Sequence, residues 1–415
     1  MSVPCSQPRY AVAQLGARMH YAVPRILHRR GWLERLYTDV YASNIGYSVL
    51  ADLASLLPSA SAKRFAGRRI EGVPSAYIHA FATFGLRYSL RNRTSRTRDE
   101  QLRTYLWANT AFGSKVVEAG FSHANAVYAF NTSALEVLTA ARRRGLKTVL
   151  EQTIAPFGVE RQLLAREREK HPAWESPSNV VHDSERAFEA RERAEWDLSD
   201  RILCGSEFVM DALCTAGVPQ SRCAVVPYGI AIEDFEAPAR VPNAGTLRAL
   251  TVGTLGLRKG TPYLLDAARR LQGRVRFRLV GLASLSPTLM ADLVAMTDVA
   301  GPVPRTRMRD EFARADVFVL PSICEGSATA TYEALAAGLP VVCTPNTGSM
   351  VRDGVDGYLV PPGDIEALVG RLEQLASNPS LRSEMSENAR ARAEALSLSA
   401  YSARLLTQLG PAAAA

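Results

Sequence analysis

The segment that decides the fold is ADVFVLPSICEGSATATYEALAAGLPVVCTPNTGS, residues 315–349. Its apolar run Val317–Leu320 has the length of a buried strand and leads into the loop Glu325-Gly326-Ser327. Residues 328–337 then form a predicted helix, with Ser327 as its N-cap and Gly338 as its stop. A strand, a glycine loop and a helix N-terminus in this order place free N–H groups at the carboxyl edge of a parallel sheet. The segment predicts a site for a diphosphate.

Two carboxylates bracket the start of this helix. Glu325 lies in the loop and Glu333 lies in the helix, with seven residues between them. Glu325 can reach a polyhydroxylated group, and Glu333 can accept hydrogen bonds from both hydroxyls of a ribose. Alternatively, Glu325 only complements the helix dipole and Glu333 is an ordinary solvated side chain. The two residues alone leave both interpretations open.

The rest of the chain alternates short apolar runs with helix-length amphipathic segments, which is typical of α/β layers around parallel sheets. Its 415 residues suffice for two or three domains. A connector rich in Pro and Gly begins near residue 218, where we place the domain boundary. The predicted strands are Tyr10–Leu15, Ala126–Phe130, Lys147–Glu151 and Arg201–Cys204 before the boundary, and Cys223–Val226, Ala249–Val252, Arg276–Val280, Val317–Leu320 and Pro340–Thr344 after it.

The composition excludes several classes of protein. Hydrophobic residues make up 47% and charged residues 22% of the chain, unlike disordered or fibrous proteins. No window approaches the roughly 18 apolar residues of a membrane-spanning helix, and the N-terminus lacks the pattern of a secretory signal, so we expect a cytoplasmic protein. The six cysteines have no metal-binding spacing, so neither a metal site nor a disulfide framework is expected.

Positive charge is concentrated in the first part of the chain. Residues 1–150 hold 21 Lys and Arg against 8 Asp and Glu, a net charge of +13, whereas the remainder carries −5. Residues 81–103 contain six arginines, preceded by Phe81, Phe84 and Tyr88 at helical spacing. This stretch is either a solvated helix face or an amphipathic patch that binds an anionic membrane or a phosphorylated lipid acceptor. No nucleic-acid-binding module accompanies the charge, so nucleic acid is not an expected partner.

The E-x7-E pattern, between a Pro-Ser strand end and A-x-G-x-P-V-V, is similar to the donor-site motif of the family-4 retaining glycosyltransferases. These are two-domain enzymes of the GT-B fold. Further segments resemble that family in the same order along the chain: VVPYGIAIEDF (residues 225–235), LTVGTLGLRKGTPYLLDAARRL (250–271), RLVG (278–281), VAGPVPRTRM (299–308) and RDGVDGYLVPPGD (352–364).

The resemblance implies two facing Rossmann-like domains, 1–218 for the acceptor and 219–394 for the donor, with a C-terminal helix near 395–409 crossing back to the first. It implies retaining transfer of a sugar from a nucleoside diphosphate sugar to an acceptor hydroxyl, in cell-surface glycan, polysaccharide or glycolipid synthesis. No cofactor is implied, and the chain has no D-x-D in a plausible metal-binding loop. If the arginine-rich stretch is the amphipathic patch, the protein lies peripherally on the inner face of the membrane, through Arg87, Arg91, Arg93 and Arg96, and takes a lipid-linked acceptor; if it is a solvated helix face, neither follows.

The family lysine that follows the glycine loop and contacts the diphosphate corresponds to Lys259 here. A cation at this point stabilises the negative charge of the leaving group. Many relatives have an arginine where this chain has Thr254, and Arg258 is the expected substitute; the alternative is that Arg258 and Lys259 are a solvated pair. The expected catalytic residues are therefore Lys259, Arg258 and Glu325. The expected donor-binding residues are Glu333, Gly326, Ser327, Ala328, Thr329, Gly253 and Gly16.

The first domain offers weaker candidates for the acceptor side. Gly16 lies in a segment that resembles the family's first glycine loop, and His20 follows it, either facing the cleft or simply in a first helical turn. Where many relatives have a cleft histidine after a first-domain strand, this chain has Asn131, and the next strand ends at Glu151. Asn131 and Glu151 are positional candidates for assisting the acceptor hydroxyl.

Two other functional classes stay open. A non-catalytic interaction or regulatory protein on the same fold would explain Thr254 and the absent histidine, but it would not need both glutamates and Lys259. A nucleotide-sugar epimerase or a glycosyl phosphorylase on the same fold is the other alternative.

Overall fold

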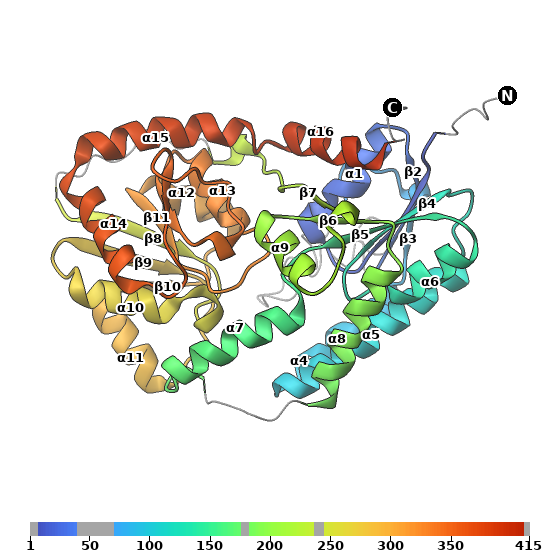
Figure 1. The fold of residues 1–415 in the computed structure, drawn as a ribbon, viewed down its shortest axis with the longest axis horizontal. Helices are drawn as coiled ribbons and strands as arrows, with labels where there is room; N and C mark the ends of the chain where they lie inside the picture. Colours follow the sequence, from blue (N-terminus) through green and yellow to red (C-terminus); the bar gives the residue numbers. More distant parts are fainter. Residues whose placement is uncertain (1–6, 40–69, 176–181, 236–244, 411–415) are drawn as a thin grey trace, which may run out of the picture.

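The computed structural model describes residues 7–39, 70–175, 182–235 and 245–410, and it contains two layered α/β units, one at each end of the molecule (Figure 1). Within these residues every strand pairing inside the two sheets is parallel. No helix in the described part of the chain has the length and apolar character needed to cross a membrane.

The first unit is built on a seven-stranded sheet, in the order β3-β2-β1-β4-β5-β6-β7. Its strands are β1 (Tyr10–Gln14), β2 (Leu33–Thr38), β3 (Ile78–Ala80), β4 (Ala126–Phe130), β5 (Lys147–Gln152), β6 (Arg201–Cys204) and β7 (Cys223–Val225). The helices that follow or connect them are α1 (Ala22–Arg29), α4 (Ala82–Thr94), α5 (Arg98–Ala119), α6 (Leu135–Arg143), α7 (Phe157–Lys170), α8 (Asp183–Asp197) and α9 (Glu207–Thr215).

Helices cover both faces of this sheet, so its central strand β4 is buried at every position and β1 is apolar up to Gln14. Alternate residues of β1 enter different cores: Tyr10 and Val12 pack with α1, whereas Ala11 and Ala13 pack with α5, α6 and α9. The apolar runs expected at β4 and β6 have the predicted bounds.

The second unit has a six-stranded sheet, in the order β10-β9-β8-β11-β12-β13. Its strands are β8 (Leu247–Val252), β9 (Val275–Val280), β10 (Asp298–Gly301), β11 (Val317–Leu320), β12 (Val341–Cys343) and β13 (Gly357–Leu359). Its helices are α10 (Thr261–Arg270), α11 (Pro287–Met296), α12 (Met308–Ala313), α13 (Thr329–Ala336), α14 (Ile365–Ser377) and α15 (Pro379–Glu394).

The structure corrects the predicted domain boundary. Residues 223–225, which we assigned to the second domain, form β7 and pair in parallel with β6 of the first sheet. The first unit therefore extends past residue 218 to at least Val225. β7 lies within the predicted connector, between Pro219 and Pro227, and composition alone did not show which sheet this strand would join.

The C-terminal helix α16 (Leu398–Leu409) crosses back to the first unit, as predicted (Figure 1). The Tyr10 hydroxyl donates to the Leu409 carbonyl at 2.6 Å, and Leu405 and Leu409 share a core with β1 and α1. The two chain crossings between the units run beside each other, because Ile230 N donates to Leu396 O and Leu398 N donates to Ile230 O. The units are thus joined by a paired connection.

Candidate functional site

Both sheets bring their candidate residues to the point where the strand order reverses. In the first sheet this point lies between β1 and β4, and the loops after these strands begin with Gly16 and Asn131. In the second sheet it lies between β8 and β11, followed by Gly253 and by the loop that contains Glu325. Ligands of open parallel sheets bind in the crevice at the carboxyl ends of the strands at such switch points.

The three residues predicted to be catalytic form one ionic cluster. Lys259 Nζ and Arg258 Nη1 each lie 2.8 Å from Glu325 Oε1. Burial lowers the pKa of Lys259, and the neighbouring Glu325 carboxylate opposes that shift. Gly260, with φ of +68°, lets this loop approach β11, because a Cβ there would lie 2.0 Å from the Pro321 carbonyl oxygen. Two cations therefore converge beside the start of α13.

The start of α13 differs from the predicted cap. Thr329 is the first helical residue and Ala328 occupies the N-cap position, while the Ser327 hydroxyl bonds to the Tyr332 hydroxyl at 2.6 Å. The prediction that Ser327 caps the helix is therefore wrong, because Tyr332 reaches back to that hydroxyl. In the described part of the chain, the N–H groups of Gly326 and Ser327 find no acceptor. They remain available to an anion at the helix N-terminus.

Glu333 pairs with a residue that sequence reasoning did not single out. Its Oε1 lies 2.9 Å from Arg305 Nη1, and the Arg305 guanidinium lies 5.4 Å from the centre of the Phe235 ring. Glu333 is only 6% exposed, and burial raises its pKa while Arg305 opposes that shift. Arg305 belongs to the segment VAGPVPRTRM that carried the family resemblance, but its role depends on contact with α13, which no spacing predicts.

His20 lies beside this pair of charges. Burial and the Arg305 and Arg25 guanidinium groups lower the pKa of His20, and Asp234 opposes them. The backbone of Met19, His20 and Tyr21 has φ between 47° and 58°, a strained region for residues other than glycine. His20 therefore associates with the Glu333 side of the cleft and is not among the residues that line the first-domain pocket.

The loop of residues 325–327, for which the sequence predicts contact with the donor, is here called the donor loop, and it contacts the first unit directly. A Cβ on Gly326 would lie 1.9 Å from the Thr153 carbonyl oxygen, and the Ser206 hydroxyl donates to the Gly326 carbonyl. Ser206 is also the N-cap of α9, since its hydroxyl accepts from Val209 N at 3.4 Å. The two units therefore meet at Gly326, beside the Lys259–Arg258–Glu325 cluster.

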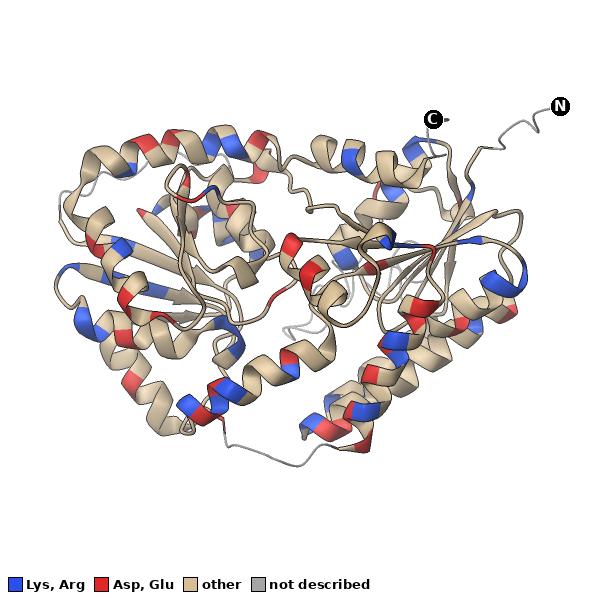
Figure 2. Cartoon of the chain, viewed as in Figure 1, with Lys and Arg blue, Asp and Glu red and all other residues tan. Residues whose placement is uncertain are grey.

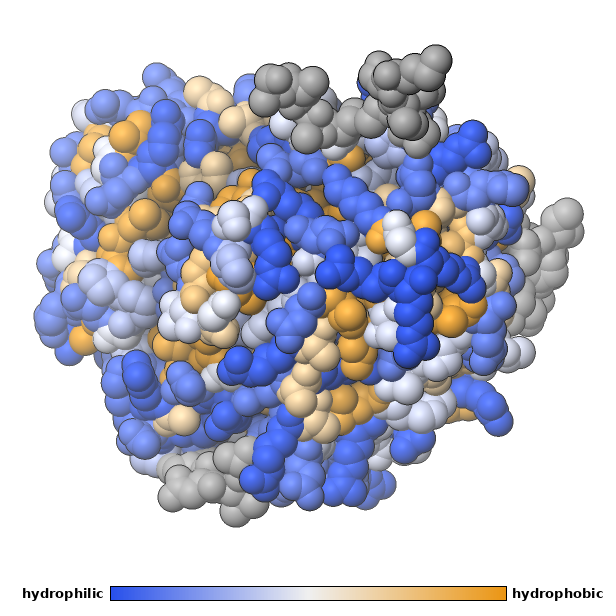
Figure 3. Space-filling model, turned by 45° about the vertical axis from the view of Figure 1, so that its right-hand side comes forward, coloured by the Kyte–Doolittle hydropathy of each residue, from blue (hydrophilic) through white to orange (hydrophobic). Residues whose placement is uncertain are grey.

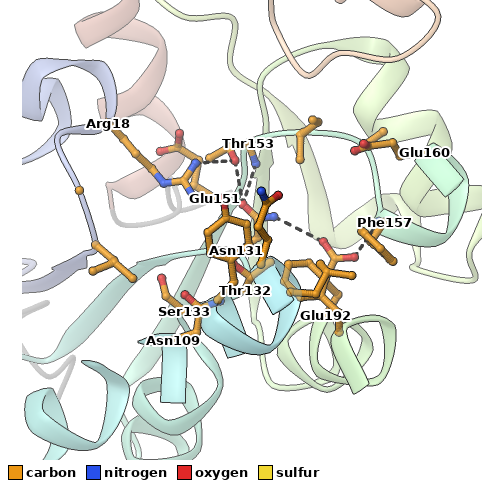
Figure 4. Close-up of a pocket in the computed structure, with 18 of the residues that line it drawn as sticks. Arg18, Asn109, Asn131, Thr132, Ser133, Glu151, Thr153, Phe157, Glu160 and Glu192 are labelled. Carbon is orange, nitrogen blue, oxygen red and sulfur yellow. Dashed lines mark hydrogen bonds between the residues drawn. The ribbon is translucent and has the colours of Figure 1, made fainter. Parts of the chain in front are cut away.

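A pocket of about 790 Å³ opens in the first unit, and Figure 4 shows its lining. Gly16, Asn131 and Glu151 all line it. Asn131 Oδ1 accepts from Thr153 N at 3.2 Å and from Thr153 Oγ1 at 2.8 Å, and its Nδ2 donates to Glu192 at 3.4 Å. The Asn131 amide thereby holds the Thr153 loop against the donor loop.

Glu151 is also fully engaged by the protein. It is 3% exposed and accepts hydrogen bonds from the hydroxyls of Tyr128 and of Tyr228, the latter at 2.8 Å. Burial raises the pKa of Glu151, and the two tyrosine hydroxyls oppose that shift. Tyr228 lies in the connection between the units, so Glu151 links the pocket floor to that connection.

Several pocket residues had no signal in the sequence. Glu160 and Glu192 lie on α7 and α8, among many charged residues of ordinary amphipathic helices, and Arg18 and Thr153 lie in loops. Burial raises the pKa of Glu192 to about 7. Only the packing of these elements around the carboxyl edge of the sheet shows that their side chains meet.

The arginine-rich stretch forms α4 and the start of α5, where the cartoon in Figure 2 marks basic positions near acidic ones. Phe84 is buried and stacks with Tyr88 and against Trp107, so this aromatic face packs inward and is not available to a membrane. The exposed apolar residues of α4 are Leu86 and Leu90, at 46% and 64% exposure. Hydrophobic atoms form several small separate patches on the face in Figure 3.

Within the described ranges, no group of three or more His, Cys, Asp or Glu side chains is arranged to hold a metal ion. The polar groups at the carboxyl edges instead form cation–carboxylate pairs and loops with free N–H groups. This arrangement suits a diphosphate held by direct contacts.

Two facing α/β units tied by a returning C-terminal helix define the GT-B architecture, and comparison with solved structures confirms this fold. The crystal structure of Anabaena Alr3699/HepE in complex with UDP superposes with a TM-score of 0.61 and 14% identity, covering 97% of this chain and 99% of that one. Sucrose-phosphate synthase from Thermosynechococcus elongatus gives a TM-score of 0.63 and 15% identity, over 97% and 98% of the two chains.

Residues 234–392, a range that includes most of the second unit, match the family model described as glycosyl transferases group 1. Sequence relatives carry related names. The amylovoran biosynthesis glycosyltransferase AmsK of Erwinia amylovora is 30% identical over 43% of this chain and 48% of its own length. A D-inositol 3-phosphate glycosyltransferase of Xylanimonas cellulosilytica is 30% identical over 46% and 52%. The matched region thus spans about half the length of these relatives.

Proposed function

We propose that the protein transfers a sugar from a nucleoside diphosphate sugar to the hydroxyl of an acceptor. The observation that carries the proposal is the convergence of Lys259 and Arg258 on Glu325, beside the unpaired N–H groups of Gly326 and Ser327. In the reaction, the bond between the anomeric carbon and the diphosphate oxygen breaks. The two cations and the helix N-terminus then stabilise the charge that develops on that oxygen.

The same arrangement assigns a role to each glutamate. When a diphosphate binds Lys259 and Arg258, the Glu325 carboxylate loses its partners to the phosphate oxygens and becomes free to contact hydroxyls of the sugar. Glu333 accepts hydrogen bonds from the ribose hydroxyls, with Arg305 beside it. Gly253 supports this geometry, because a Cβ there would lie 2.9 Å from Lys259 Cε. We include Ala328, Thr329 and Gly16 as further residues of the donor loops.

A nucleotide-sugar donor is supported by the structural neighbour Alr3699/HepE, whose crystal structures include complexes with UDP and with UDP-glucose. Synthesis of a cell-surface polysaccharide is supported by relatives named for amylovoran and colanic acid biosynthesis. Retention at the anomeric carbon, assignment to family 4 and independence from metal ions and other cofactors rest on the motif resemblance and remain part of the proposal.

The acceptor is proposed to bind in the pocket of the first unit. This pocket lies across the Gly326–Thr153 contact from the Lys259–Arg258–Glu325 cluster, which we call the donor cluster. Asn131 and Glu151 act there as positioning residues, because their polar atoms are occupied by protein groups. We further propose that the protein works on the cytoplasmic face of a membrane. Its anionic lipids would bind the exposed arginines of α4 and the loop after it, namely Arg87, Arg91, Arg93 and Arg96.

The donor site is tested by calorimetry with UDP and by release of nucleoside diphosphate from a set of nucleotide sugars, with and without a lipid extract. Glu333→Ala should weaken UDP binding by about 1 to 3 kcal/mol, the value of lost hydrogen bonds to a charged group. Glu366→Ala is the matched control, since Glu366 lies on α14 and pairs with the exposed Arg270. Wild-type affinity in Glu333→Ala would remove Glu333 from the site. Nucleotide-sugar binding without diphosphate release under any condition would favour the non-catalytic alternative.

A further inference from the structure

The pocket of the first unit is lined by more acidic than basic side chains, although much of its lining comes from residues 1–150, where basic residues predominate. Its lining includes four carboxyl groups and two guanidinium groups. Residues 1–150, in contrast, carry a net charge of +13. The charged residues of the lining are Asp39, Glu151, Glu160, Glu192, Arg18 and Arg98. A phosphate group entering this pocket would meet more negative than positive groups.

The two arginines of the lining are already engaged. Arg18 Nη1 donates to Thr153 Oγ1 at 2.9 Å, and its guanidinium lies 5.8 Å from the centre of the Phe130 ring. The Arg98 guanidinium lies 5.7 Å from the centre of the Phe157 ring, and its Nε lies 3.7 Å from a Glu185 oxygen. Recognition of a phosphate by arginine normally uses the guanidinium fork directly. Both guanidinium groups that line the pocket already contact other groups of the protein.

Two polar side chains of the lining make no hydrogen bond to another side chain or to the backbone among the described residues. Asn109 is only 5% exposed, and its amide is not among the fully buried polar atoms, so its accessible part faces the pocket that it lines. An amide held almost buried at a cavity wall, with its hydrogen-bonding capacity unused by the protein, is available to a ligand. The Glu160 carboxylate likewise has no hydrogen bond or ion pair with the residues that the structure describes. Figure 4 shows Asn109 and Glu160 at opposite sides of the pocket.

Four aromatic side chains form a further part of the pocket wall. Tyr88, Tyr105, Phe157 and Phe188 all line the pocket. Aromatic rings provide flat apolar surface that packs against the C–H faces of a pyranose, while carboxylate and amide groups bind its hydroxyls. A volume of about 790 Å³ is within the usual range for small-molecule sites.

We propose that this pocket binds the acceptor through an uncharged saccharide residue, with Asn109 and Glu160 as its hydrogen-bonding groups, and that it discriminates against a phosphorylated polyol. The inference rests on the proposed function and deepens it, because it names the class of acceptor. The reacting hydroxyl lies at the Glu160 end of the pocket. Burial raises the pKa of Glu160, the Arg258 and Arg98 guanidinium groups oppose that shift, and the Glu325 carboxylate adds to it, so the charges of the Lys259–Arg258–Glu325 cluster act on this end of the pocket.

The test is saturation-transfer NMR on the full chain saturated with UDP, whose binding is first measured alone by calorimetry. The probes are methyl α-D-glucopyranoside, methyl α-D-galactopyranoside, methyl α-D-mannopyranoside and maltose on one side, and D-myo-inositol 3-phosphate and glucose 1-phosphate on the other. We expect at least one neutral glycoside to bind at least tenfold more tightly than either phosphorylated probe. Glu160→Gln and Asn109→Leu should each weaken that binding at least tenfold while UDP affinity is unchanged.

Glu169→Gln is the control for the glutamate, because Glu169 is exposed on the same helix α7. If Asn109→Leu does not fold, Glu160→Gln alone decides the result. Preferential binding of a phosphorylated probe overturns the inference, as does a protein that binds UDP but none of the neutral glycosides. Failure to bind UDP in the first step contradicts the proposed function itself, so the two failures are distinguishable.

Discussion

Replacing Gly326 by alanine should separate nucleotide binding from transfer. The added Cβ would lie 1.9 Å from the Thr153 carbonyl oxygen and 2.8 Å from the Ile154 Cα, both backbone atoms of the first unit. Carbon and carbonyl oxygen normally approach no closer than about 3.3 Å. The two units must then withdraw from each other by more than about 1 Å at this contact.

A displacement of about 1 Å between reacting groups can lower a rate about 100-fold, or about 2.7 kcal/mol of transition-state stabilisation. We therefore expect Gly326→Ala to reduce kcat by about two orders of magnitude. Its melting temperature should stay near that of the wild type, because the clash is relieved by movement of whole units. Steady-state release of nucleoside diphosphate measures kcat, and calorimetry with UDP checks that the donor domain still binds.

The control is Gly370→Ala on α14, where an added Cβ has open space. That variant should leave kcat and UDP affinity unchanged. The reasoning would be refuted by a Gly326→Ala protein with normal kcat, since the contact at Thr153 would then not belong to the active arrangement. A variant that fails to bind UDP would show instead that the Cβ acts on the donor loop alone.

Three further predictions address the cations, the buried carboxyl groups and the surface. Lys259→Ala should lower kcat roughly 100-fold with little change in melting temperature, because Arg258 still pairs with Glu325; near-normal kcat would transfer the role to Arg258. Burial raises the pKa of Glu192 from 4.5 to about 7, so the folded protein retains a proton that the unfolded chain loses, and this residue makes stability fall as the pH rises through that interval. Glu192→Gln should flatten that part of a plot of melting temperature against pH, and an unchanged slope would contradict the assignment. The membrane prediction is tested by replacing four exposed arginines together with Gln: Arg87, Arg91, Arg93 and Arg96. Each arginine should contribute about 1 kcal/mol to binding of anionic vesicles, so the variant should no longer sediment with them, while its UDP affinity is unchanged. Wild-type protein that does not sediment with such vesicles even at low salt would show that these residues are a solvated surface.

The sequence predicted the elements that are buried on both sides. Strands such as Ala126–Phe130 and Val317–Leu320 are uninterrupted apolar runs, because helices cover both faces of each sheet. The sequence missed four strands at or next to the edges of the sheets: β2 and β10 contain charged residues within their bounds, and β3 and β13 have three residues each. A short or charged strand at the edge of a sheet has no hydrophobic pattern that separates it from a loop.

The candidate site also divides into residues that the sequence predicted and residues that only the structure shows. Lys259, Arg258 and Glu325 lie within short motifs whose local geometry is fixed by glycines, so their convergence followed from the sequence once the motifs were aligned on one sheet edge. Arg305 and Glu160 became visible only through contacts between elements distant in the chain. No periodicity marks such residues, because their surroundings are created by the packing of elements that are distant in the chain.

The returning helix has a consequence for the order of events during synthesis. Tyr10, in β1, donates its hydroxyl to Leu409, 399 residues later in the chain, and α16 completes the apolar face around β1 and α1. A ribosome releases the first unit long before it releases this helix, and domains generally begin to fold as they emerge. The nascent first unit must therefore wait with the apolar surface beneath α16 uncovered until the second unit has been translated. Truncation at residue 397, which spares every residue of the donor cluster, should consequently yield a chain that aggregates or engages chaperones.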